Sequence, residues 1–67
     1  MDMVILQKQL WEAAKMGDSE GIEDAIKAGA DANFKYPEEG DASALQCAAL
    51  NGNSDAVAKL VSLGADV

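Results

Sequence analysis

Residues 10–32 read LWEAAKMGDSEGIEDAIKAGADA, and residues 45–67 read LQCAALNGNSDAVAKLVSLGADV. With a shift of 35 residues the two stretches align without a gap and are identical at eight of 23 positions. The identities include a double alanine, a glycine three residues later, a serine, and the triplet Gly-Ala-Asp. Because the glycines coincide as well as the alanines, a shared alanine-rich composition does not explain the match. The chain therefore carries two copies of one structural unit.

Each copy is expected to form a helix, a tight turn, a second helix and a glycine stop. In the first copy, Leu6, Leu10, Ala13 and Ala14 follow the i, i+4, i+7, i+8 spacing of one helical face. Asp2 is placed to cap the start of this helix. The corresponding positions of the second copy are Leu45, Ala48 and Ala49.

Glycine and serine mark the turn between the two helices of each copy. Gly17 is expected to adopt the left-handed conformation that commonly ends a helix. Ser19 is expected to be the N-cap of the next helix, which Gly29 ends. The second copy repeats this scheme with Gly52, Ser54 and Gly64. The apolar stripes of the second helices are Ile22, Ala25 and Ile26 in the first copy, and Val57, Leu60 and Val61 in the second.

The length of 67 residues allows one small domain, with a first unit at residues 1–33 and a second unit, linker included, at residues 34–67. One cysteine and no histidine exclude an internal disulfide and the common zinc spacings. The longest apolar run, near residues 3–6, is too short to span a bilayer. We expect an intracellular, cytoplasmic protein, without excluding the nucleus.

Twelve acidic residues against five lysines give a net charge of −7. This balance excludes a basic face for nucleic-acid phosphates and disfavours anionic membranes. It is compatible with a protein partner that carries a basic patch, and it also serves solubility.

The segment between the units, residues 30–43, reads ADANFKYPEEGDAS. Its proline, glycine and acidic residues predict a loop, which we expect to form an extended, hairpin-like finger.

The order helix, glycine, helix, Gly-Ala-Asp resembles the ankyrin repeat family. That family carries T-P-L-H-x-A-A, a glycine, a hydrophobic helix and G-A-D-V-N. Here residues 43–46 are Ser-Ala-Leu-Gln, so only Leu45 matches the T-P-L-H positions, whereas residues 48–49, 52 and 64–67 match fully. The first unit lacks T-P-L-H and looks like a starting repeat. The resemblance implies an all-α fold of two helix-turn-helix repeats, stacked as a short solenoid and joined by a β-hairpin-like finger.

Two departures from the family affect the linker. The period is 35 residues rather than about 33, and the two extra residues are expected within KYPEEG. Loss of the threonine, proline and histidine at positions 43, 44 and 46 removes the hydrogen bonds that brace the turn in the family. We therefore expect a looser finger.

No residue pattern supports catalysis or a cofactor. A nucleophilic Cys47 would need a base such as histidine, so a small core residue is the better interpretation. Residues 31–39 resemble a calcium loop only at Asp31 and Asn33, because Lys35 and Tyr36 do not fit it. The sequence thus predicts a non-enzymatic protein without metal or cofactor. Trp11 is interpreted as packing on the linker, with a role as a binding anchor as the alternative.

The resemblance implies that a binding surface is formed by the ends of the first helices and the linker tip. Met16 and Leu50 are apolar residues at positions expected to be exposed. The chain is therefore predicted to be a protein–protein interaction module with a concave, acidic surface. Packing of the same residues on neighbouring repeats is an equal alternative. The candidate binding residues are Lys15, Met16, Phe34, Tyr36, Glu38, Glu39, Asp41, Leu50 and Asn51.

A structural role is the alternative function. The first unit would be the polar N-terminal cap of a longer solenoid, with Gln7, Lys8, Glu12 and Lys15 on its outer helix. The second unit is apolar, so its far side is expected to expose apolar surface to a further repeat or to a second copy of the chain. The candidate residues of this self-association face are Val57, Leu60, Val61 and Leu63.

Overall fold

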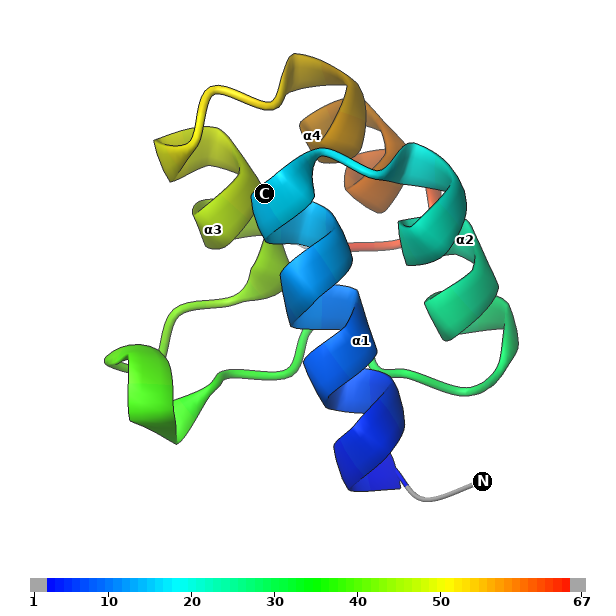
Figure 1. Cartoon of the computed structure of the whole chain (residues 1–67), viewed down its shortest axis with the longest axis vertical. Coiled ribbons are helices and arrows are strands. Elements are labelled where there is room, and N and C mark those ends of the chain that lie inside the picture. Colours follow the sequence, from blue (N-terminus) through cyan, green and yellow to red (C-terminus); the bar gives the residue numbers. More distant parts are fainter. Residues whose placement is uncertain (1–2, 66–67) are drawn as a thin grey trace.

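The repeated pattern of alanine and glycine produces two helical pairs. The computed structural model describes residues 3–65, with helices α1 (Met3–Met16), α2 (Ser19–Lys27), α3 (Ala44–Leu50) and α4 (Ser54–Ser62) and a 3-10 turn, η1 (Pro37–Glu39). Helix α1 packs on α2 and α3 packs on α4, and the pairs stack with α1 against α3 and α2 against α4 (Figure 1). Since residues 3–65 contain no β-strand, the all-α prediction is confirmed. The expected cap Asp2, and the residues Asp66 and Val67, lie outside the described residues.

The turn within each helical pair is built around a left-handed glycine, as predicted. Gly17 has a φ of 75° and Gly52 a φ of 69°. The predicted N-caps are wrong by one residue, because both serines are already the first residues of their helices. The N-cap of α2 is Asp18, whose side chain accepts a 3.0 Å hydrogen bond from the backbone N–H of Gly21.

Asn53, the N-cap residue of α4, bridges the two units. Its side chain makes no capping bond to α4. Instead its Nδ2 donates hydrogen bonds to the backbone carbonyls of Ala14 and Lys15, both at 3.0 Å. The last turn of α1 and the start of α4 are thereby joined across the interface between the units.

The core is small and rich in alanine. Leu10, Ile22 and Leu60 are its largest fully buried side chains. Buried alanines surround them on all four α-helices, which lets the helix backbones approach closely. The predicted inner faces of α1 and α2 are confirmed. Within residues 3–65, no helix has the length and apolar character needed to cross a membrane.

The linker does not form the expected hairpin-like finger. Its only ladder element within the described residues is an isolated antiparallel bridge between Tyr36 and Ala42, which closes over the 3-10 turn η1. The Tyr36 N–H donates to the Ala42 carbonyl at 2.9 Å, and the Asp41 N–H donates to the Tyr36 carbonyl at 2.9 Å. The result is a tight loop beside α1 and below α3, drawn in green in Figure 1.

Hydrogen bonds of the Gln7 side chain hold the start of the linker against α1. Its side chain was expected on a polar outer face, but it is only 4% exposed. Its Oε1 accepts a hydrogen bond from the Asp31 N–H, and its Nε2 donates to the Asp31 carbonyl at 3.3 Å. The Tyr36 hydroxyl donates to the backbone carbonyl of Gln7 at 2.6 Å. One turn of α1 therefore positions both ends of the segment from residue 31 to residue 36.

Candidate functional site

Two exposed apolar side chains stand at the ends of α1 and α3. Met16 is 79% exposed and Leu50 is 86% exposed, as their positions predicted. The bonds of Asn53 to the end of α1 hold the turns that follow these helices close together. A groove of about 360 Å³ runs between the turns, and it is lined by Met16, Gly17, Gly52, Asn53, Ser54, Asp55 and Ala56.

The aromatic residues of the linker form a cluster with α1. The ring of Tyr36 lies 4.8 Å from the ring of Trp11 and 4.8 Å from the ring of Phe34, centre to centre. The second pair meets edge to face, which is a favoured arrangement. The prediction that Trp11 packs on the linker is confirmed.

Tyr36 itself is not available to a partner. Its ring is buried between two others and its hydroxyl is bonded to Gln7, so its place among the candidate binding residues is wrong. Burial raises the pKa of Tyr36 to about 12. Phe34, at the edge of the same cluster, remains 36% exposed. No periodic pattern predicts this difference, because the linker follows neither helix nor strand spacing.

The acidic candidates lie together on the linker. Glu38, Glu39 and Asp41 are all exposed on or just after η1. Lys15 and Asn51 are exposed at the ends of α1 and α3. The Asn51 side chain donates a 2.8 Å hydrogen bond to the Cys47 carbonyl, so it also closes its own helix. The acidic loop precedes α3, whereas Met16 and Leu50 lie at the far ends of α1 and α3, so the structure gathers these candidates into two groups at opposite ends of α3 (Figure 1).

The predicted self-association face contains one error. Leu60 has no exposed surface and belongs to the core, so it cannot lie on an outer face. Val61 is 41% exposed, and Val57 and Leu63 are half-buried against the core. Leu60 fits the apolar stripe of α4 because that helix packs on α2 as well as on α3.

Comparison of equivalent positions in the two units shows what the sequence argument missed. Leu10 and Ala14 of the first unit are completely buried. Their counterparts Leu45 and Ala49 are half-buried and exposed. We define the far face as Leu45, Ala49, Val57 and Val61, which repeat Leu10, Ala14, Ile22 and Ile26 after 35 residues. The alignment already pairs these positions. Only the burial of the first unit's residues shows that their counterparts in the second unit form an uncovered apolar face.

Cys47 is a buried, free cysteine, as predicted. Burial raises the pKa of its thiol, which opposes formation of the reactive thiolate. Among residues 3–65, no three acidic, cysteine or histidine side chains gather where they could hold a metal ion.

No protein-family model matches this chain, and no curated protein matches it either.

Proposed function

We propose that the chain is an ankyrin-type protein-binding module. The internal repeat and the stacking of two helix-turn-helix pairs support this proposal. Its binding surface extends along α3, from the apolar ends of α1 and α3 to the exposed edge of Phe34 and the acidic loop at the other end of α3. A basic, partly apolar protein surface is the complementary partner.

The observation that carries this proposal is the exposure of Met16 and Leu50. Both are large apolar side chains held at one end of the molecule, and neither contributes to its core. Methionine and leucine at such positions can enter a partner's apolar pocket. The loop carboxylates, at the other end of α3, can pair with lysines or arginines of the same partner. Electrostatic attraction by Glu38, Glu39 and Asp41 would mainly raise the association rate.

The test compares three baits in cell extract: the natural chain, the double variant Met16→Lys with Leu50→Lys, and the control Val4→Lys. Val4 is also an exposed apolar residue, 72% exposed, but it lies at the opposite end of α1. A protein captured by the natural chain and the control, and lost with the double variant, is then purified for titration calorimetry. We expect the double variant to bind roughly ten-fold more weakly or worse, as for loss of hot-spot residues. Equal affinity for all three baits would contradict the proposed surface.

The far face supports a second candidate function, a structural unit of a longer stack. Leu45, Ala49 and Val61 repeat a surface that, in the first unit, is covered by α3 and α4. A further helical pair with the inner residues of α3 and α4 would therefore fit on them. A second copy of the chain is the other occupant considered for this face.

Appending a second copy of residues 33–67 to the chain tests the structural role. We expect urea unfolding to show a free energy of unfolding higher by on the order of 2–4 kcal/mol, because the half-exposed far face becomes buried. The same extension with Val61→Lys in the original unit should lose most of this gain. Sedimentation velocity of the natural chain over a range of concentrations tests self-association, with Val61→Lys and Val4→Lys as the matched pair. A monomer at every concentration would exclude the second copy as the occupant.

A further inference from the structure

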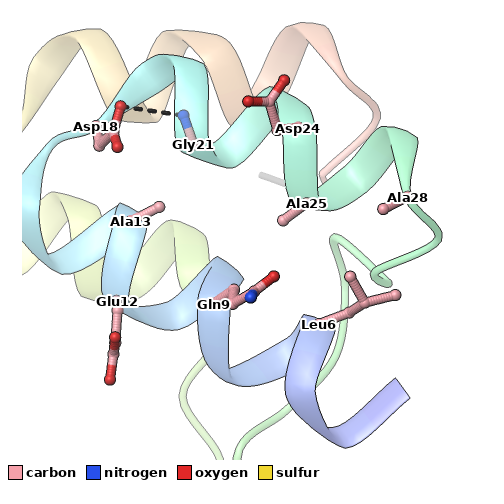
Figure 2. A pocket seen from close by; sticks show the side chains of 9 residues that line it. All are labelled: Leu6, Gln9, Glu12, Ala13, Asp18, Gly21, Asp24, Ala25 and Ala28. Carbon is pink, nitrogen blue, oxygen red and sulfur yellow. Dashed lines mark hydrogen bonds between the residues drawn. The ribbon is translucent and has the colours of Figure 1, made fainter. Parts of the chain in front are cut away.

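A groove separates α1 from α2 on the side of the first unit that faces away from the second. It encloses about 420 Å³. Figure 2 shows the side chains of Leu6, Ala13, Ala25 and Ala28 between the two helices, as an apolar floor. The Glu12 carboxylate lies outside this floor along α1, and the Asp24 carboxylate lies along the opposite edge on α2 (Figure 2). Gln9, Asp18 and Gly21 complete the lining.

The internal repeat explains the shape of this groove. A shift of 35 residues carries Gln9, Glu12, Ala13, Gly21 and Ala25 onto Ala44, Cys47, Ala48, Ala56 and Leu60. All five of the latter side chains are buried where the second unit packs on the first. The groove is thus the first unit's copy of a face that, in the second unit, receives two helices.

The chemistry of the two faces differs. Glu12 and Asp24 stand where the second unit has Cys47 and Lys59, and three carboxylates, with no lysine, line the groove. Asp18 already accepts the capping bond from Gly21, but an apolar helix placed on this face would partly desolvate Glu12 and Asp24 without pairing them, which is costly. A helix with lysines or arginines on both sides of a small apolar stripe would pair them.

We propose that the groove between α1 and α2 binds a basic amphipathic helix of another protein. The apolar side chains of that helix rest on Leu6, Ala13 and Ala25, and its cations pair with Glu12 and Asp24. Gly21 lets α2 approach α1 closely beside this floor, because a Cβ there would lie 3.2 Å from the Ala13 Cβ and 2.7 Å from Oδ2 of Asp18. This site is separate from the helix ends and loop proposed above, and it does not depend on them.

The test uses a synthetic lysine–leucine–alanine helix of about 18 residues as the probe, since much shorter peptides are marginal helices in water. The ¹⁵N-labelled full chain is titrated with this peptide at about 0.15 M salt, which screens long-range attraction. A peptide with every lysine replaced by glutamate is the matched probe. We expect amide shifts confined to α1 and α2 with the lysine peptide and none with the glutamate peptide.

Two double variants with the same change of net charge decide whether the site is specific. Glu12→Lys with Asp24→Lys reverses the charge of the groove, and Asp31→Lys with Asp55→Lys makes the same change of net charge outside it. All four side chains are exposed, and melting curves verify that both variants fold. We expect Kd to rise roughly ten-fold or more for the groove variant and to stay within about two-fold for the control variant. The proposal is overturned if the peptide does not bind, if both variants weaken it equally, or if the shifts centre on the loop. Any of these results would mean that the acidic groove is only a water-facing end of the stack.

Discussion

Replacing Asn53 by alanine should weaken the contact between the two units more than its half-buried location suggests. The side chain supplies both amide hydrogens to the end of α1, at the carbonyls of Ala14 and Lys15. The Ala14 carbonyl also accepts a bond from the Gly17 N–H at 3.3 Å, so it keeps a partner in the variant. The Lys15 carbonyl loses its bond to the second unit. At about 0.5–1.5 kcal/mol per hydrogen bond, we expect a loss of roughly 1–2 kcal/mol in the free energy of unfolding.

Asn53→Asp distinguishes this role from ordinary helix capping. Aspartate is as good an N-cap as asparagine, and the equivalent residue Asp18 caps α2 in that way. An aspartate at position 53 has no donor for the two carbonyls and places a negative charge against them. We therefore expect Asn53→Asp to be destabilised like Asn53→Ala. The matched substitution Asp18→Asn should be nearly neutral, because an asparagine side chain can still accept the bond from Gly21.

Urea unfolding followed by the fluorescence of Trp11, the only tryptophan, measures these differences. For a domain of this size, 1 kcal/mol corresponds to a melting-temperature change of about 4–8 °C, so thermal circular dichroism is an independent readout. An Asn53→Asp chain as stable as the natural protein would refute the bridge between the units. It would mean that residue 53 serves α4 alone.

Three further predictions concern buried groups. Leu60→Ala should cost about 2–5 kcal/mol in urea unfolding, whereas Val61→Ala, on the same helix but at the surface, should cost less than about 1 kcal/mol. The Tyr36 pKa is about 12 in the folded protein and about 10 in the unfolded chain, so the contribution of Tyr36 to stability should be constant below pH ~10 and decrease as the pH rises towards 12. Tyr36→Phe should remove that part of the decrease in pH-dependent unfolding. Cys47 should react with a disulfide reagent at least ~10-fold more slowly in the folded protein than in urea, and equal rates would disprove its burial.

The helices were predictable because their signals are local. The spacing of Leu6, Leu10 and Ala14 marks one face, and a left-handed glycine ends each first helix. The N-caps were less certain because two good capping residues stand side by side at positions 18 and 19. Geometry decides between them, since the Asp18 side chain reaches the N–H three residues ahead. Sequence preference alone ranks aspartate and serine about equally.

The linker was not predictable because its structure depends on α1. Pro37 and Gly40 correctly mark a loop, but they do not say whether the aromatic side chains point to water or to a helix. Gln7 and Trp11 decide this by binding the backbone near residue 31 and the ring of Tyr36. Both are far from the linker in sequence. Trp11 was expected to pack on the linker, but Gln7 does not differ in kind from the polar surface residues of the same helix.

The two outer faces of the stack differ in a way that limits how copies of the chain can associate. The far face offers Leu45, Ala49 and Val61, whereas the opposite face carries Glu12 and Asp24. Head-to-tail stacking would bring the two carboxylates against apolar side chains and remove them from water without a partner. Burying unpaired charges costs several kcal/mol, so open filaments are disfavoured. Contact between the far faces of two copies buries none of these carboxylates. Because each copy has one far face, the assembly is complete with two copies. Any self-association of this chain should therefore stop at a dimer, and the carboxylates of the first unit are the physical reason.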